Sequence, residues 1–197
     1  MYKNEARQPH LRQQQQQHPS SDFSLKTTKQ AAMSPKYKIY FCGSIRAGRG
    51  DADLYGRITE MLGKYGTILT PFVANKATTA MGNSEGEAKT DKEIYDRDVR
   101  LLKECDAVVA EVTQPSLGVG YEIGRANAMG KKILCLYRPQ PDKLLSAMIR
   151  GAEVEGKFLT RDYKEEDLPD LFDHFFNKVV CKVERRNSLN WQSYEPM

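Results

Sequence analysis

Five short apolar runs alternate with five helical patterns between residues 37 and 177 of this 197-residue chain. The apolar runs are residues 37–42, 67–73, 107–112, 132–137 and 157–160. The helical patterns are residues 53–64, 91–104, 119–129, 143–149 and 165–177. Consecutive βα units form a doubly wound parallel sheet, because right-handed crossovers return each helix onto the sheet. The sequence therefore predicts a single α/β domain at 37–178 with five parallel strands in the flavodoxin-like or Rossmann-like order 2-1-3-4-5.

Positive charge is concentrated at the start of the chain. The whole sequence has 30 Lys and Arg against 26 Asp and Glu, a formal net charge of +4. Residues 1–36 contain six of the bases and two of the acids, so the rest of the chain is balanced. A nucleic-acid-binding domain needs a clustered basic surface. The sequence therefore argues against a nucleic-acid polymer as partner of the domain.

The two ends of the chain differ in composition from the domain. Residues 1–36 include the block Gln13–Gln17 and few large apolar side chains, which predicts a disordered, Gln-rich basic tail. An organellar transit peptide is the open alternative for this segment. Residues 179–197 are interpreted as a polar C-terminal tail. Since no apolar run has the length of a membrane helix or the form of a secretory signal, we expect a cytoplasmic or nuclear protein without membrane contact.

Histidine and cysteine usage excludes several kinds of site. Of the three histidines, His10 and His18 fall in the N-terminal tail and only His174 lies in the domain. A histidine-based triad or a metal site with several histidines is therefore not expected. The cysteines have no Cys-x-x-Cys spacing and are predicted to be reduced core thiols. They are Cys42, Cys105, Cys135 and Cys181. We expect no metal and no other cofactor.

Two glycine-rich turns follow the first and third predicted strands. The first, residues 43–50, contains Ser44 and Arg46, and the second, residues 114–120, opens the next helix. An open α/β sheet binds ligands where such strands end, and backbone amides, a hydroxyl and a guanidinium suit a phosphate. The second turn has Gly-x-Gly-x-x-x-Gly spacing, so it does not predict a dinucleotide site. Anion binding and an ordinary structural turn both remain open.

Asp98 interrupts the apolar stripe of the helix predicted at 91–104. A carboxylate on a buried helix face must be paired, hydrogen-bonded or protonated, because leaving an unpaired charge without water is costly. General acid catalysis would use such a carboxyl group. An ion pair with Arg46 or Arg97 that anchors a loop is the structural alternative.

Three other polar residues have a functional and an ordinary interpretation. Glu122 can face the crevice or be favoured by the dipole of its helix. Tyr40, near the end of the first strand, can point its hydroxyl at the same crevice or be a half-buried strand tyrosine. Ser146 lies in an apolar helical pattern, where a serine usually bonds to its own helix backbone. Two carboxyl groups across one crevice, those of Asp98 and Glu122, would suit glycosidic chemistry.

Three sequence runs are together specific for one family. They are YFCGSIR at 40–46, the segment 106–122 ending in VAEVTQPSLGVGYE, and LLSAMIRG at 144–151. They closely resemble the 2′-deoxynucleoside 5′-phosphate N-hydrolases, relatives of the nucleoside 2-deoxyribosyltransferases. The resemblance covers residues 37–177. It implies a homodimeric N-glycosidase that converts deoxynucleoside monophosphates, with purines such as dGMP preferred, into free base and 2-deoxyribose 5-phosphate.

The resemblance also assigns roles to individual residues. Glu122 matches the nucleophile that forms a covalent ester with the sugar, and Asp98 matches the acid that assists departure of the base. Tyr40 matches the tyrosine that positions the nucleophile. The implied substrate-binding residues are Gly43, Ser44, Ile45, Arg46, Ser116, Gly118, Ser146 and Met148. Ser146 matches a serine that completes the phosphate site of the neighbouring subunit.

One segment departs from the family pattern. Residues 70–73 read TPFV, where the resembling proteins carry Glu-His, so the base preference is less certain than the catalytic set. A nucleoside 2-deoxyribosyltransferase, which passes the sugar to a second base, is one alternative function. A non-catalytic nucleotide-binding protein with the same pocket is another.

Overall fold

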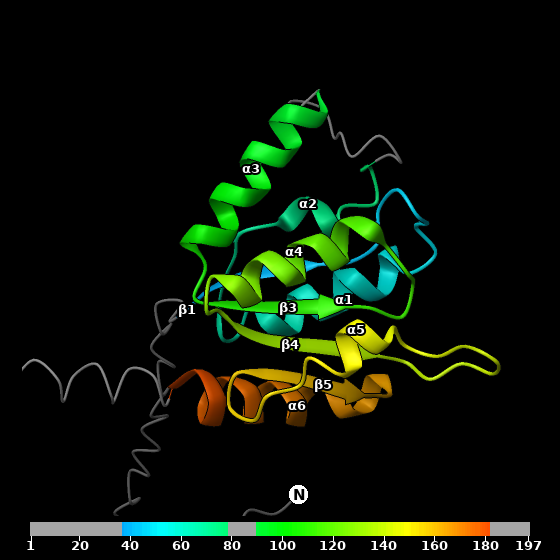
Figure 1. The fold of residues 1–197 in the computed structure, drawn as a ribbon, viewed down its shortest axis with the longest axis vertical. Helices are drawn as coiled ribbons and strands as arrows, with labels where there is room; N and C mark the ends of the chain where they lie inside the picture. The colour runs from blue at the N-terminus through cyan, green and yellow to red at the C-terminus, as the bar shows by residue number, and fades with distance from the viewer. Residues whose placement is uncertain (1–36, 79–89, 182–197) are drawn as a thin grey trace, which may run out of the picture. The chain divides into compact units, whose positions relative to one another are not determined.

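The structure, a computed structural model, describes residues 37–78 and 90–181 and contains a five-stranded parallel sheet (Figure 1). Its strands are β1 Tyr37–Cys42, β2 Gly66–Ile68, β3 Ala107–Glu111, β4 Lys132–Tyr137 and β5 Phe158–Asp162. They lie in the order β2-β1-β3-β4-β5, and each neighbouring pair is parallel. The predicted α/β class and strand order are confirmed.

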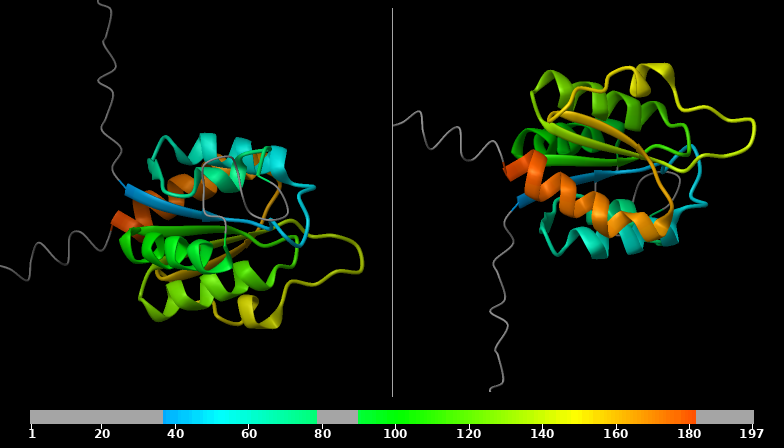
Figure 2. Two further views of the ribbon diagram at one scale, coloured as in Figure 1. Left: turned by 90° about the horizontal axis from the view of Figure 1, so that it is seen from above. Right: turned by 90° about the horizontal axis from the view of Figure 1, so that it is seen from below.

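Helices cover both faces of the sheet. They are α1 Ala52–Leu62, α2 Pro71–Ala74, α3 Asp91–Glu104, α4 Leu117–Ala128, α5 Ala147–Arg150, η1 Glu165–Asp167, α6 Leu168–His174 and the π-helical η2 Phe175–Val180. Figure 2 shows α1 and α6 on one face and α4 and α5 on the other. Helix α3 packs beside α4. The two turns predicted to bind a ligand follow β1 and β3, so both lie at the carboxyl end of the sheet.

The sequence determines where α3 begins through a capping box. The Thr90 hydroxyl accepts a hydrogen bond from the Glu93 backbone N–H at 3.2 Å, and the Glu93 carboxylate accepts one from the Thr90 N–H at 2.8 Å. Acidic residues in the first turn and Lys103 in the last turn also complement the helix dipole. This cap fixes the residue at which the helix begins, and Leu101 and Leu102 are the residues that the helix buries.

The strand predicted at 67–73 is too long. Strand β2 ends at Ile68, and Pro71 begins the short helix α2. Proline lacks the N–H that a strand ladder needs, and its backbone geometry suits the first turn of a helix. The buried Thr70 side chain takes over the pairing with β1: its hydroxyl accepts from the Phe41 N–H at 3.0 Å and donates to the Phe41 carbonyl at 2.6 Å.

The helix predicted at 143–149 is also wrong at its start, because α5 begins only at Ala147. Before it the chain turns tightly at Asp142, which has a φ of 58°, and a bridge joins Gln140 to Lys143. Ser146 is the N-cap residue of α5, has non-helical backbone angles and is exposed, and its side chain does not cap the helix. Ser146 therefore lies just before a helix and not within one, contrary to the pattern.

The other predicted elements agree with the structure to within about two residues, except that the last helical run continues through Val180. The C-terminal tail predicted at 179–197 therefore starts too early, because Val179 and Val180 are helical and buried. The predicted tail at 1–36 and residues 182–197 lie outside the described residues. In the described part of the chain no helix is long and apolar enough to cross a membrane. Nor do the described side chains include three His, Cys, Asp or Glu residues placed to hold a metal ion together. All four cysteines are free thiols, and three of them are buried.

Candidate active site

A hydrogen bond links β1 to α4 at the centre of the site. The Tyr40 hydroxyl donates to the Glu122 carboxylate oxygen Oε1 at 2.8 Å. Tyr40 is only 1% exposed, and both its burial and the Glu122 charge raise its pKa well above the usual range. The tyrosine therefore stays a neutral donor and holds the carboxylate in one position.

The surroundings of Glu122 raise its pKa to about 7. Loss of water is the largest cause, and the negative charge of Asp98 adds to it. The hydrogen bond from Tyr40 opposes the rise, as do the Cys42 thiol and the Arg97 charge. A carboxylate with a pKa near neutrality exchanges its proton easily, which is typical of a catalytic group.

Asp98 and Glu122 line the same pocket, between α3 and α4, with a volume of about 320 Å³. Arg46 and Gly118 also line it. The structure thus brings two acids that are distant in the sequence to a single cavity, together with one residue from each glycine-rich turn.

The ion pair of Asp98 is made with its neighbour in sequence. Arg97 Nε lies 2.9 Å from Asp98 Oδ1, and both side chains are less than one-fifth exposed. The Arg97 guanidinium also stacks 3.6 Å from the centre of the Phe72 ring. Of the two partners considered for Asp98, the structure therefore shows Arg97, while Arg46 pairs with Asp91 at 2.7 Å on the surface.

The first turn is built around Tyr55 of α1. The Ser44 N–H donates to the Tyr55 hydroxyl at 3.1 Å. A Cβ atom on Gly43 would lie 2.7 Å from the Tyr55 ring, so only glycine permits this approach. The Ser44 hydroxyl is buried and has no hydrogen-bond partner among the described residues. Such a group is costly unless a ligand or an ordered water molecule pairs with it. Ile45 is half-buried and packs against the core.

The second turn leads into α4. Ser116 caps this helix, and its hydroxyl accepts from the Val119 N–H at 3.5 Å. The Gln114 side chain donates to the Ala47 carbonyl at 3.2 Å and so joins the second turn to the first. The amino end of α4 therefore lies beside the buried Ser44 turn, an arrangement that favours an anion.

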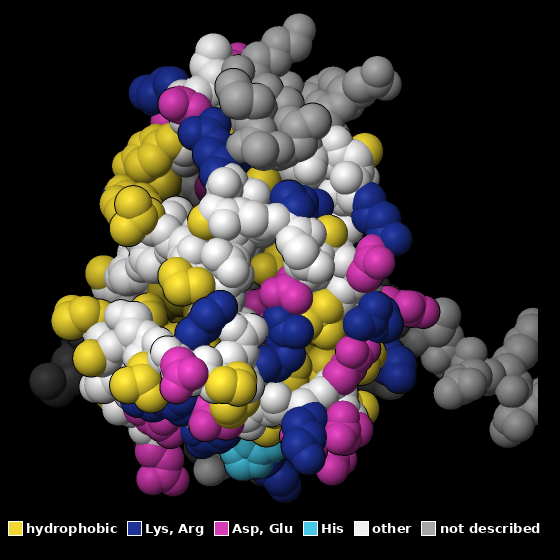
Figure 3. All heavy atoms as spheres, turned by 90° about the vertical axis from the view of Figure 1, so that its right-hand side faces the viewer, with side chains coloured by type: hydrophobic (Ala, Val, Ile, Leu, Met, Phe, Trp, Pro, Cys, Tyr) yellow, Lys and Arg dark blue, Asp and Glu magenta, His cyan; other side chains and the backbone are white. Residues whose placement is uncertain are grey.

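Ser146 and Met148 lie in a different cavity. They line a pocket of about 710 Å³ on the other side of the second turn, together with Ser116. The structure of this chain does not bring either residue to the pocket of Asp98 and Glu122. Figure 3 shows the carboxyl-end face of the sheet, where acidic and basic side chains meet and hydrophobic side chains gather along one side.

A family model decides the relationship: the model for nucleoside 2-deoxyribosyltransferase matches residues 39–163. This chain belongs to that family. A Danio rerio relative named 5-hydroxymethyl-dUMP N-hydrolase is 51% identical over 142 residues, covering 72% of this chain and 97% of the relative. The Homo sapiens relative of the same name is 52% identical over 138 residues, covering 70% and 78%.

The sequence patterns did not indicate that Tyr95 and Tyr121 line the pocket. The hydroxyls of Tyr95 and Tyr121 lie 3.3 Å apart at the rim of the pocket, and Arg125 donates to Tyr121 at 3.0 Å. Tyr95 lies three residues before Asp98 and therefore on the same face of α3. This spacing could have indicated that Tyr95 lies near the pocket. Nothing in the sequence indicated the stacking of Arg97 on Phe72.

Proposed function

We propose that this chain hydrolyses the N-glycosidic bond of 2′-deoxynucleoside 5′-monophosphates. The products would be a free base and 2-deoxyribose 5-phosphate. The observation that carries the proposal is the Tyr40–Glu122 hydrogen bond, which holds a carboxylate of raised pKa in one pocket with Asp98. The names of the relatives, which are nucleotide N-hydrolases, support the same class of reaction.

In the proposed mechanism the ionised Glu122 attacks the anomeric carbon of the sugar. The bond to the base nitrogen breaks, and its electron pair leaves with the base, which takes up a proton from the Asp98 carboxyl group. Water then attacks the anomeric carbon of the glycosyl ester, gives a proton back to Asp98 and releases the Glu122 carboxylate. This is the two-step scheme of retaining glycosidases, in which a carboxylate stabilises an oxocarbenium-like transition state.

The substrate phosphate would bind between the two glycine-rich turns. The unpartnered Ser44 hydroxyl and the Ile45 backbone can donate to phosphate oxygens, and Arg46 adds a positive charge. Ser116 and Gly118 approach from the amino end of α4. A substrate with a 5′-phosphate satisfies the buried Ser44 hydroxyl, whereas a nucleoside leaves it unpaired.

The missing 2′-hydroxyl of the substrate has two expected effects. Without this electron-withdrawing group the developing cation forms more easily. The nearly inaccessible Tyr40, fixed on Glu122, also leaves little room for a ribose hydroxyl beside the nucleophile. We therefore propose that ribonucleotides are poor substrates.

The base preference is the finer part of the proposal. The family resemblance implies a purine, as in dGMP, whereas the Danio rerio and Homo sapiens relatives are named for 5-hydroxymethyl-dUMP, which carries a pyrimidine. Pro71 and Phe72 stand where the resembling proteins carry Glu-His, on the side expected to receive the base, and the Phe72 ring stacks against Arg97. Both nucleotides therefore belong in the test.

The test is release of free base from four compounds: dGMP, 5-hydroxymethyl-dUMP, GMP and deoxyguanosine. We expect hydrolysis of at least one deoxynucleotide, with kcat/KM at least about 100-fold lower for GMP and for deoxyguanosine. Equal rates on GMP would contradict the deoxy preference. Faster base exchange than hydrolysis, after addition of a second free base, would identify a transferase. Thermal stabilisation by nucleotide without any base release would identify a binding protein.

We also propose that the active unit is a homodimer in which Ser146 completes the phosphate site of the neighbouring subunit. Leu117, Leu144 and Met148, which line the 710 Å³ pocket, are 96%, 97% and 82% exposed. Such large apolar side chains gathered around one cavity are typical of an association surface. Ser146 lies among them, apart from the catalytic carboxylates of its own chain.

Replacing Leu144 by glutamate should convert the dimer into monomers, because the interface would then bury an unpaired charge. Sedimentation velocity measures this change. Val154→Glu is the matched control, since Val154 is 54% exposed but does not line the pocket. A wild-type protein that sediments as a monomer at assay concentration while fully active would contradict the dimer.

A further inference from the structure

A buried glutamate lies on the face of the sheet opposite the proposed catalytic residues. Glu111, the last residue of β3, is fully buried. It lies two residues beyond Val109, the register partner of Phe41, and so on the same face as Phe41, whose ring packs against Tyr55 of α1. The catalytic hydrogen bond leaves β1 from Tyr40, on the other face. The proposed mechanism gives Glu111 no role.

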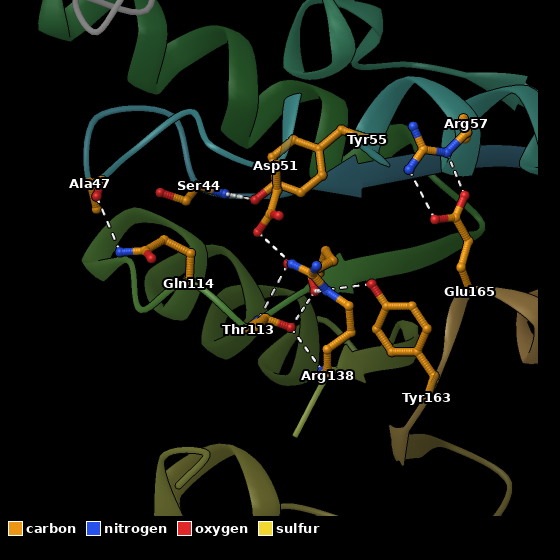
Figure 4. A network of polar contacts seen from close by, with 11 residues as sticks. Ser44, Ala47, Asp51, Tyr55, Arg57, Thr113, Gln114, Arg138, Tyr163 and Glu165 are labelled. Carbon is orange, nitrogen blue, oxygen red and sulfur yellow. Dashed lines mark hydrogen bonds and ion pairs between the residues drawn. The ribbon is translucent and has the colours of Figure 1, made fainter. Parts of the chain in front are cut away.

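Glu111 is the centre of a polar network, and Figure 4 labels its partners Thr113, Arg138 and Tyr163. Its Oε1 accepts hydrogen bonds from the Thr113 hydroxyl, from the Tyr163 hydroxyl at 3.1 Å and from Arg138 Nε at 3.5 Å. Burial raises the pKa of this carboxyl, while Thr113, Arg138 and Tyr163 act to lower it. A buried acid is tolerated only with such partners, so the network has to form as a unit.

Arg138 connects this network to both glycine-rich turns. Its guanidinium lies 2.6 Å from the Asp51 carboxylate, at the point where the first turn enters α1. Its backbone N–H donates to the Thr113 hydroxyl at 2.8 Å, just before the second turn. Arg138, the first residue after β4, therefore connects the turn that follows β1 to the turn that follows β3.

We propose that Asp51, Arg138 and Glu111 are positioning residues that hold the two turns at the separation a 5′-phosphate requires. This inference rests on the proposed function and adds a determinant of phosphate affinity to it. The network lies behind the turns and does not line the pocket of Asp98 and Glu122. Turns that are already held in place bind the phosphate more tightly, because less conformational entropy of the turns is lost on binding.

Asp51→Asn is the sharpest variant, because it removes the ion pair to the first turn and leaves the buried Glu111–Arg138 contact in place. We expect KM for a hydrolysed deoxynucleotide such as 5-hydroxymethyl-dUMP to rise about tenfold, with kcat changed less than about twofold. The kcat/KM for the matching nucleoside, which has no phosphate, should not change. Asp51→Glu, which keeps the charge, should restore KM in part.

The matched control is Arg57→Gln. Arg57 forms an ion pair with Glu165 between α1 and η1, and both side chains are about half exposed. Breaking this pair removes a surface charge contact of α1 without affecting either turn. Arg57→Gln should therefore leave KM for the nucleotide unchanged.

Two outcomes would overturn the inference. One is an unchanged nucleotide KM in Asp51→Asn. The other is an equal loss on nucleotide and nucleoside together with a lowered melting temperature, which would mean that the network only supports the fold.

The proposed function can fail separately, if the wild-type protein releases no base from any nucleotide. Calorimetry still tests the network in that case. A Glu122→Gln protein should bind dGMP about tenfold more tightly than the Glu122→Gln, Asp51→Asn double variant. Equal binding by the two would overturn the role of Asp51.

Discussion

Replacing Glu122 by glutamine is expected to lower kcat/KM for deoxynucleotide hydrolysis at least about 10³-fold, because an amide cannot act as the nucleophile. Glutamine has nearly the same shape, and its side-chain oxygen can still accept the hydrogen bond that Tyr40 donates at 2.8 Å. The fold and substrate binding should therefore persist. Base release measures the loss, and calorimetry with dGMP measures binding.

Glu104→Gln is a suitable control for this variant. Glu104 is an exposed residue at the end of α3, paired with Arg100, and it does not line the pocket of Asp98 and Glu122. It should keep wild-type activity. The proposed covalent step can be observed directly, since acid quenching during turnover should leave a 2-deoxyribosyl 5-phosphate adduct on the Glu122 peptide. A Glu122→Gln protein that retains more than about a tenth of the activity would exclude this residue as nucleophile.

Replacing Tyr40 by phenylalanine should move the acid limb of the pH profile of kcat/KM to higher pH. Glu122, whose pKa is about 7, must be ionised to attack, so activity rises as pH increases through that value. The Tyr40 hydrogen bond lowers this pKa, and its removal therefore raises it. A hydrogen bond to a charged group contributes roughly 1.5–3 kcal/mol, which corresponds to a shift of about one to two pH units.

At pH 6 this shift should reduce the activity of Tyr40→Phe by about tenfold or more, and the loss should be smaller at pH 9. The measurement is kcat/KM across this range with a single deoxynucleotide. Tyr65→Phe is the control, because the Tyr65 hydroxyl bonds to Asp173 and not to the site. An acid limb that stays in place would show that Tyr40 does not control the ionisation of Glu122.

Much of the fold could be predicted because local spacing encodes it. Helix α3 has the predicted bounds, since its capping box and apolar stripe lie within one continuous segment. The two errors have different causes. The Thr70 hydroxyl, through a contact with the distant Phe41, replaces part of the expected strand pairing. The tight turn at Asp142 is a local feature that the helical pattern did not reveal, and α5 begins only at Ala147.

The sequence could predict which residues belong to the candidate site, but not which side chains form ion pairs or stack on one another. The carboxyl ends of parallel strands meet at one edge, so the two glycine-rich turns were expected to lie close together. That Asp98 pairs with Arg97 and not with Arg46 depends on side-chain directions, and so does the stacking of Arg97 on Phe72. Periodicity does not specify these directions.

The sequence by itself determined the order of strands and helices, and it showed one histidine and two candidate acids, Asp98 and Glu122, in the domain. Only the tertiary structure decided that Tyr40 bonds to Glu122, 82 positions away, and that Arg138 connects Asp51 to Glu111. The physical reason is the range of the forces. Backbone preferences act over a few neighbouring residues, whereas the pKa of a buried carboxylate depends on whatever the folded chain places against it.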